Sequence, residues 1–534
     1  MFERVDSLAN LVSDVNACAL PGCNIKYEAF CHVCSAAIRA GYVNGDTGTY
    51  IMNGLRYGFD LGCPEGVPGQ SVFRNYPSAI EGRVSVTRAT MARVGMGKTL
   101  YLGLMSAGLL LYLKRRYPRF SIFPMGAVPK PLEPSEMRPT SDHSRTRFNK
   151  FTCMARFRHA LTAYKDVAYL LKKGFVMYVT DVEAAFPMLP LAPCIWMFFM
   201  FKFFADDVTT NESLFMHIFG DFGAAGLPGT FKLFFVDCVI PMARYALRLT
   251  LPMVVYVDDV GMIGRTEHET DAEMRRFQEW CERVTGIVFK VLKDKAASTL
   301  QLYVGFWWDS ISMTRTLDER KLVAYLALLD DYVKARSLSL RERRSIGGKM
   351  VRAIMTLPPG ASCLLSSIFL LMHGLTLGWQ TRRTTKEERS DFLLLAVLLR
   401  LNMGRGYYSF DEFIKGVVTA ASDASKERRF AGGGYWTRGI RNTYRFFRFG
   451  GRAARHTIMV LEGFTSLLCG SDNGYLWRNH FVDFWIDNQS YAGAGNKGRS
   501  RSYTANVICK RWFVVMVRHM FIVQFRWVCR RLRE

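Results

Sequence analysis

Two adjacent carboxylates, Asp258 and Asp259, stand in the middle of the apolar, β-branched run from Pro252 to Gly264. Such a run is typical of two buried strands with the acids at the bend between them. Buried carboxylates must be protonated, paired or bound to a cation, because an isolated charge is costly to bury. The run contains no Lys or Arg, and hard oxygen ligands suit Mg²⁺. The alternative is a plain acidic turn, although such turns favour Asn-Gly or Asp-Gly and Val260 follows here.

A third acid, Asp181, ends another β-rich run that begins at Phe175. An Asp at the end of a central strand can meet Asp258 and Asp259 on a neighbouring strand. Three carboxylates at one place repel one another unless metals bind. The cluster therefore predicts a two-metal site, in which the ions lie ~3.5–4 Å apart.

The same pattern recurs near the end of the chain, where Asp423 follows the β-branched run that begins at Val417. Glu462 lies in an expected helix, and Asp487 follows an expected strand, 481–486. A strand Asp, a helix Glu and a strand Asp resemble the metal-binding triad of an RNase H fold. That resemblance implies a second metal site at Asp423, Glu462 and Asp487.

Composition favours a globular, nucleic-acid-binding protein. At 534 residues the chain has room for roughly three or four domains. Apolar residues make up 49% of it and the mean hydropathy is +0.04, which indicates ample core material. The 71 Lys and Arg exceed the 46 Asp and Glu, and a net charge of +25 favours a polyanionic partner. A basic membrane-surface protein is the alternative, but it explains none of the acids.

Thirteen Cys show no small-domain disulfide spacing, and the first four residues are no secretory signal. Both observations predict a reducing, intracellular location, cytoplasmic and/or nuclear, without secretion. Cys18, Cys23, Cys31 and Cys34 could hold one Zn²⁺; free buried cysteines are the alternative interpretation.

The elements between these residues are partly readable. The apolar run from Leu100 to Leu113 is too short to span a bilayer and predicts a buried helix, and no membrane association is expected. Thr270 to Thr285 has helical spacing, with Thr270 as the expected N-cap and Gly286 just past the end. Residues 318 to 380 are expected to be helical, with a basic face at 341–349 that grips duplex phosphates.

Tyr256-Val257-Asp258-Asp259 resembles the catalytic hairpin of reverse transcriptases. Asn75 to Ala79, with Asp487 to Gln489 and Gly498 to Ser502, resembles DIRS-like (tyrosine-recombinase) retroelements. Pro124 to Lys130 with Arg138 to Ser144 resembles the fingers hairpin of reverse transcriptases, Phe222 to Phe231 a retroelement pattern, and Leu302 to Phe306 the primer-grip hairpin. No single motif is decisive, but the constellation covers roughly residues 55 to 530.

The resemblance implies roles for individual residues. Lys130 and Arg138, on a fingers hairpin, would hold the nucleotide phosphates. Phe186 would exclude a ribose 2′-OH and select deoxynucleotides, unless its ring is only core. A Gly-rich loop would let the template approach, although Ala224 stands where the family has Leu. The implied substrate-binding residues are Lys130, Arg138, Phe186, Tyr256, Gly223, Pro228 and Phe231, and the implied polymerase metal ligands are Asp181, Val182, Asp258 and Asp259.

Two further points follow from the family. Either Lys293 or Lys295 would lie near the pyrophosphate leaving group. In the RNase H-like region, Gly432 to Gly434 would form the first hairpin turn. The family's last helix, with a fourth acidic ligand, does not follow Trp527, which leaves ribonuclease H activity open.

The sequence thus predicts an α/β protein: a right-hand polymerase of fingers, palm and thumb, then an RNase H-like α/β domain. The expected divisions are 1–95 (an N-terminal extension), 96–310 (fingers and palm), 311–415 (thumb and connection) and 416–534 (RNase H-like). The implied activity is RNA-directed DNA polymerisation with Mg²⁺, Mn²⁺ as a possible substitute, dNTPs and an RNA or DNA template-primer. The alternative is an inactive nucleic-acid-binding relic of such an element.

Overall fold

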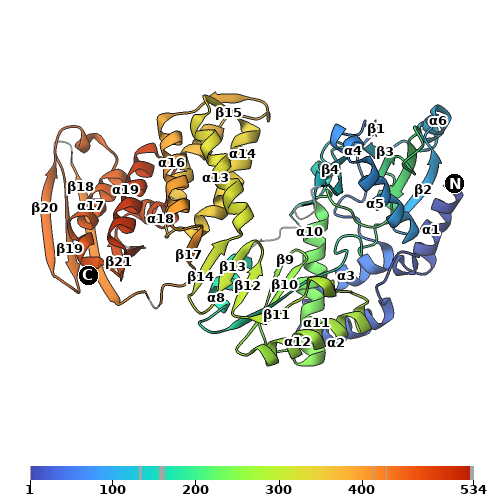
Figure 1. Ribbon diagram of the computed structural model, residues 1–534, viewed down its shortest axis with the longest axis horizontal. Helices are drawn as coiled ribbons and strands as arrows, with labels where there is room; N and C mark the ends of the chain where they lie inside the picture. The colour runs from blue at the N-terminus through green and yellow to red at the C-terminus, as the bar shows by residue number, and fades with distance from the viewer. Residues whose placement is uncertain (1, 131–134, 156–162, 412, 428–429, 529–534) are drawn as a thin grey trace. The chain divides into compact units, whose positions relative to one another are not determined.

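The computed structural model describes residues 2–130, 135–155, 163–411, 413–427 and 430–528 (Figure 1). The chain forms two compact units, which are described separately. The N-terminal unit comprises Met1–Leu171 and Phe175–Val304, and the C-terminal unit comprises Lys172–Gly174 and Gly305–Glu534. Helices and strands alternate in both units, so the expected α/β class is confirmed.

A four-stranded antiparallel sheet forms the centre of the N-terminal unit. In sheet order its strands are β11 (Lys295–Ser298), β6 (Val176–Asp181), β10 (Asp259–Gly264) and β9 (Met253–Tyr256). Every residue of β6 is buried, which is why its first four residues, Val176 to Val179, are all apolar and do not alternate with polar ones. Helix α12 (Glu267–Trp280) packs on β6, β10 and β11.

A second sheet of five strands lies in the same unit. Its order is β1 (Gln70–Val72), β3 (Phe120–Phe123), β7 (Met200–Phe203), β8 (Ser213–His217) and β2 (Thr99–Leu104). A separate hairpin consists of β4 (Met125–Pro129) and β5 (Met137–Ser141). The helices around these sheets are α1 (Phe2–Asp14), α2 (Tyr27–Arg39), α3 (Gly45–Tyr57), α4 (Pro77–Glu81), α5 (Arg83–Gly95), α6 (Ala107–Arg116), α7 (Phe148–Phe151), α8 (Ala163–Leu170) and α9 (Pro193–Trp196).

Two local predictions are wrong. The run from Leu100 to Leu113 is not one helix but strand β2 followed by helix α6, which Ser106 caps by accepting from the Leu109 N–H. Short apolar runs fit either element, and pairing with β8 decides in favour of the strand. Helix α12 is capped by Thr266, not by Thr270, which lies inside the helix and donates its hydroxyl to the Thr266 carbonyl.

One continuous helical stretch is apolar for most of its length: α10 (Gly226–Phe231), the π-helical η2 (Lys232–Val239) and α11 (Ile240–Leu247). By length and composition alone it could cross a membrane, and among the described residues no other helix could. However, 67% of its apolar window is buried within the protein, and Phe234 and Phe235 are fully buried. A helix that is buried to this extent belongs to the protein core.

The C-terminal unit begins with three strands that pair antiparallel to one another and a group of helices. The strands are β13 (Phe306–Asp309), β14 (Thr314–Leu317) and β17 (Arg405–Tyr407), and a small ribbon pairs β15 (Ser337–Ser339) with β16 (Thr381–Arg383). The helices are α13 (Glu319–Lys334), α14 (Leu340–Ala353), α15 (Ser366–Met372) and α16 (Lys386–Leu401). In α13, the expected core stripe buries Tyr325 and Leu329.

The last part of the chain is a five-stranded sheet with helices on one face (Figure 1). Its order is β20 (Thr443–Phe449), β19 (Ala431–Arg438), β18 (Gly416–Lys426), β21 (His480–Ile486) and β22 (Ile522–Trp527). Strand β18 is antiparallel to β19 and parallel to β21, which is parallel to β22. The accompanying helices are α17 (Ile458–Asn473), α18 (Gln489–Lys497) and α19 (Tyr503–His519).

The predicted turn at Gly432 to Gly434 is wrong, because these residues lie within β19, opposite Ser425 to Asp423 of β18. The chain reverses earlier, where the Glu427 N–H donates to the Phe430 carbonyl. Glycine runs favour turns, but in β19 the glycines leave room for neighbouring side chains, Thr465 beside Gly433 and Phe446 beside Gly434.

A fully buried ion pair joins two helices of the C-terminal unit. The Arg343 guanidinium in α14 donates to both carboxylate oxygens of Glu388 in α16, at 3.0 Å each, and to the Leu338 carbonyl. Both side chains are 0% exposed. Arg343 therefore does not belong to the basic surface expected at 341–349, whereas Arg341 and Arg344 are exposed.

Replacing Glu388 with Ala should destabilise the C-terminal unit by roughly 3–5 kcal/mol, because it leaves the buried guanidinium of Arg343 without a counter-charge. Hydrogen exchange of α14 and α16, measured by mass spectrometry, should report the loss. Asp330→Ala is the matched control, since its ion pair with Arg400 is exposed at 43–46%. Equal protection in both variants would show that the buried pair does not hold these helices together.

Candidate functional site

Strand pairing brings the three palm carboxylates together. Asp181 is the last residue of β6 and lies directly opposite Asp259, the first residue of β10. Asp258 occupies the turn between β9 and β10, and its carbonyl accepts from the N–H of Val182 at 2.9 Å. Val257, beside it, has a φ of +59°, a left-handed conformation that is unusual for a β-branched residue. The surrounding sheet therefore imposes a strained turn that presents the acids.

The surroundings of this turn disfavour negative charge on Asp258 and Asp259. Burial, followed by the charge of Asp181, raises the pKa of Asp258. Burial, followed by the charges of Asp258 and Asp181, raises the pKa of Asp259 to about 6. Burial and neighbouring negative charge both make ionisation of these carboxyl groups costly. A bound divalent cation would offset that cost, and hard cations such as Mg²⁺ prefer oxygen ligands. The donor chemistry of these residues therefore suits Mg²⁺, although the ligand atoms of Asp181, Asp258 and Asp259 do not all lie within 4.8 Å of one another.

Two lysines neutralise Asp181. Lys290 Nζ lies 2.6 Å from Asp181 Oδ1, and Lys293 Nζ lies 2.9 Å from Oδ2. Of the two lysines left open by the sequence, Lys293 thus contacts the acids, whereas Lys295 donates to the Leu302 carbonyl at 3.4 Å. The sequence patterns did not identify Lys290. The feature that could have identified it is its spacing of three residues from Lys293, across the short helix η4 (Val291–Lys293).

The segment that follows the β4–β5 hairpin is tied to the Gly-rich loop by a buried hydrogen bond. His143 Nε2 lies 3.0 Å from Asp221 Oδ2, and both side chains are buried. Next to it, the Ser141 N–H donates to the Phe222 carbonyl at 3.0 Å. Gly223 has a φ of +138°, and a Cβ there would lie 1.9 Å from the Ser141 carbonyl oxygen. Two motifs about 80 residues apart therefore form one structure that requires glycine.

The predicted nucleotide-contact residues lie around this structure. Lys130 is 3.7 Å from Glu136 in an ion pair at the end of the hairpin, and Arg138 is exposed opposite Val128. By strand alternation, Lys130 and Arg138 share one face of the hairpin. These positions agree with two cations on one hairpin face.

Phe186 lies in an aromatic cluster. It is 8% exposed, and its ring centroid is 5.2 Å from that of Phe222 and 6.2 Å from that of Phe231 in α10. Phe222 itself is 54% exposed, and sequence reasoning assigned it no role. Pro228 lies on α10 and Tyr256 ends β9, with the Tyr256 ring 5.8 Å from that of Tyr164.

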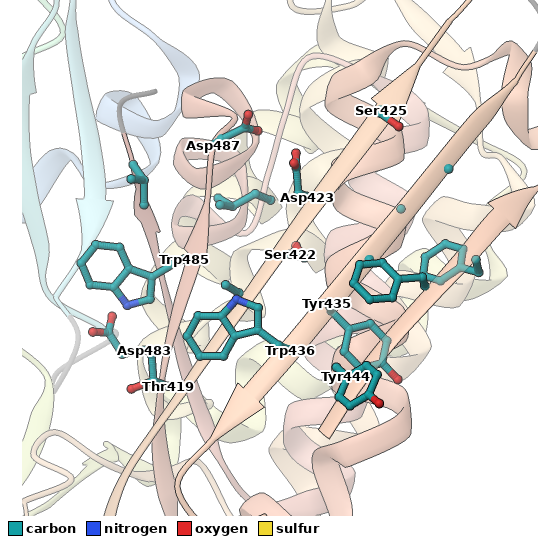
Figure 2. A pocket seen from close by; sticks show the side chains of 18 residues that line it. Thr419, Ser422, Asp423, Ser425, Tyr435, Trp436, Tyr444, Asp483, Trp485 and Asp487 are labelled. Atoms are coloured by element: carbon teal, nitrogen blue, oxygen red, sulfur yellow. The ribbon is translucent and has the colours of Figure 1, made fainter. Parts of the chain in front are cut away.

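The second acidic group is more compact, and Figure 2 shows two of its members, Asp423 and Asp487. Ligand atoms of Asp423, Glu462 and Asp487 all lie within 4.8 Å of one another, and no other trio of His, Cys, Asp or Glu in the described ranges meets that spacing. Glu462 is 1% exposed and accepts from the Ala424 N–H at 3.0 Å. Burial, followed by a hydrogen bond with Asp487, raises the pKa of Glu462 to about 9. These three carboxylates also fit a divalent ion.

Among the described residues, the cysteines considered as possible zinc ligands, Cys18, Cys23, Cys31 and Cys34, do not form such a group. Cys34 lies on α2 with its Sγ 3.5 Å from that of Cys238 in η2, and both thiols are buried. Cys18 donates to the Leu55 carbonyl instead. The alternative interpretation, free cysteines in or beside the core, describes this region.

Comparisons with known proteins give structural likenesses only. No family model matches the chain, and no curated protein matches it. A foamy viral protease-reverse transcriptase (dRH) in complex with double-stranded DNA aligns at 12% identity, TM-score 0.49, over 93% of this chain and 81% of the other. Foamy viral protease-reverse transcriptase with an RNA/DNA hybrid aligns at 13% identity and TM-score 0.47, and with double-stranded DNA at 14% and 0.46; both cover 93% of this chain, and 62% and 97% of the other.

Removing the lysines from Asp181 should strengthen cation binding at the palm. We expect Lys290→Met with Lys293→Met to raise the affinity for Mn²⁺ about tenfold, because two competing positive charges disappear. Electron paramagnetic resonance of free Mn²⁺ measures it, in a chain that also carries Asp423→Asn to weaken the other acidic group. Lys202→Met is the matched control, since that lysine pairs with Glu212. Unchanged affinity in the double variant would contradict competition at Asp181.

Proposed function

We propose that this chain is an RNA-directed DNA polymerase of a retroelement, of the DIRS-like type by its motifs. The observation that carries the proposal is the pairing of Asp181 with Asp259 on adjacent strand ends, with Asp258 in the strained turn beside them. Nucleotidyl transfer consists largely of positioning and charge neutralisation, and this arrangement provides both.

The chain's own residues divide the work. Lys130 and Arg138 would bind the triphosphate of the incoming dNTP, and the loop at Gly223 would approach the template strand. Lys293, beside Asp181, would stand near the pyrophosphate. Asp181, Asp258, Asp259 and the backbone of Val182 would hold Mg²⁺, which when bound stabilises the attacking and leaving oxygens.

Asp258→Asn should abolish dNTP incorporation, by at least a hundredfold, because it removes one of three metal-binding carboxylates. Primer extension on an RNA template with Mg²⁺ measures it, with template-primer affinity measured in parallel. Asp207→Asn, in an exposed loop, is the control. Extension by Asp258→Asn at the wild-type rate would overturn the assignment, and binding without extension by the unmodified chain would favour the inactive relic.

Phe186 is proposed to exclude ribonucleotides. Its ring is held by Phe222 and Phe231, so its position is fixed rather than free to yield to a 2′-OH. Phe186→Val should raise the ratio of rNTP to dNTP incorporation at least tenfold. An unchanged ratio would assign the ring to packing alone.

A second activity is proposed from the compact group Asp423, Glu462 and Asp487: cleavage of RNA in an RNA–DNA hybrid. Three carboxylates gather there among the described residues, and Glu462 is almost wholly buried, so we expect weak cleavage with Mg²⁺ and some rescue by Mn²⁺. A labelled hybrid, with Asp423→Asn as control, provides the assay. Brisk Mg²⁺-dependent cleavage that Asp423→Asn removes would show that three carboxylates suffice.

A further inference from the structure

One asparagine side chain bridges the backbone of the Gly-rich loop, residues 221–226. Asn149 Nδ2 donates to the Gly223 carbonyl at 2.9 Å, and Asn149 Oδ1 accepts from the Ala225 N–H at 2.8 Å. The two bonds lie on either side of Ala224, whose side chain is buried. A side-chain amide that both donates to and accepts from a backbone can replace the hydrogen bonds of a neighbouring strand. Asn149 therefore fixes the backbone of a segment that lies outside the sheets.

Asn149 is itself held in place by its surroundings. It lies in α7 next to Phe148, which is fully buried and whose ring centroid lies 5.1 Å from that of Phe199. Arg147, just before the helix, has a φ of +69°, a left-handed conformation that arginine rarely adopts. The second amide hydrogen of Asn149 goes to Ser144 Oγ at 2.9 Å. Because both amide hydrogens are used within the protein, the geometry favours a positioning role over direct contact with a substrate.

The residues on both sides of Phe222 are fixed as well. The side chain of Asp221 shares a buried hydrogen bond with His143 at 3.0 Å, and the Gly223 carbonyl accepts from Asn149. Phe222 projects from this backbone and is 54% exposed. Since burial does not hold the Phe222 ring, the loop backbone decides where the ring points.

Phe222 in turn packs against Phe186. The two ring centroids lie 5.2 Å apart with 58° between the ring planes. On its other side Phe186 meets Phe231, which is 1% exposed and belongs to the core. One neighbour of Phe186 is thus fixed by burial, and the other is fixed only through the loop that Asn149 bridges.

We infer that Asn149 is a positioning residue for nucleotide selection. By fixing the loop backbone, it keeps Phe222 against Phe186 and so prevents the Phe186 ring from yielding to a ribose 2′-OH. The inference rests on the proposed function, because it assigns Asn149 a part in the same site. The sequence patterns gave this residue no role, since it lies five positions after Ser144, where the fingers motif ends.

The test is incorporation of a single dNTP or rNTP by the full chain on a primed RNA template. Asn149→Ala removes both bonds to the loop and should raise the ratio of rNTP to dNTP incorporation about fivefold. Asn149→Asp keeps the acceptor for the Ala225 N–H but loses the donor, so it should raise the ratio less. The ratio does not depend on how much of the chain is folded, so a loss of stability alone would leave it unchanged.

Asn402→Ala is the matched control and should leave the ratio at the wild-type value. Asn402 makes the same kind of bridge in the C-terminal unit, because it donates to the Thr356 carbonyl at 2.9 Å and accepts from the Gly404 N–H at 3.0 Å.

Two further measurements separate positioning from other roles. Phe186→Val combined with Asn149→Ala should give the same ratio as Phe186→Val alone, since Asn149 acts through that ring. Hydrogen exchange of the peptide 221–231, measured by mass spectrometry without substrate, should be faster in Asn149→Ala than in Asn402→Ala, because the Ala225 N–H loses its acceptor.

An unchanged ratio in Asn149→Ala, while the unmodified chain extends primers with dNTPs, would overturn the inference and leave the proposed function standing. Effects that multiply in the double variant would show that Asn149 acts independently of Phe186, and unchanged exchange of 221–231 would show that the loop does not need the asparagine. Each of these results contradicts the inference alone. No extension by the unmodified chain would overturn the proposed function, and the inference with it.

Discussion

The structure depends on holding like charges together against their repulsion. Asp181 and Asp259 face each other because their strands pair in that register, and Asp258 joins them because the turn between β9 and β10 is two residues long. Ladder hydrogen bonds fix the acids in place, and buried strands prevent them from spreading. Burial, followed by this repulsion, raises the pKa values of Asp258 and Asp259, and Lys290 and Lys293 offset the charge of Asp181.

The two acidic groups solve the same problem differently. In the palm, the sheet delivers the carboxylates and a short helical turn supplies two ammonium groups. In the RNase H-like sheet, Glu462 comes from a helix and is almost wholly buried, and its pKa rises to about 9. In the first group, the lysines offset the negative charge of Asp181. In the second group, burial disfavours ionisation of Glu462. A divalent ion would stabilise the ionised carboxylates of either group.

Contacts between segments that are distant in the sequence position the other motifs. His143 pairs with Asp221, and Gly223 packs against the Ser141 backbone, so the fingers hairpin and the Gly-rich loop position each other. Phe186 gains a fixed ring from the same loop through Phe222. Cations on the hairpin and the aromatic cluster thus belong to one rigid frame within the N-terminal unit.

The sequence by itself determined the class of fold, the strand ends at Asp181 and Asp259, and the end at Gly286 of the helical segment that continues α12 through Thr285, because buried strands and caps have local signatures. It could not determine which element a short apolar run joins, so Leu100 to Leu113 proved to be a strand and a helix. Nor could it show that Arg343 is buried, since its partner Glu388 lies 45 residues away. Only tertiary structure placed Lys290 on Asp181 and packed Gly223 against the Ser141 backbone, because both contacts depend on which surfaces meet.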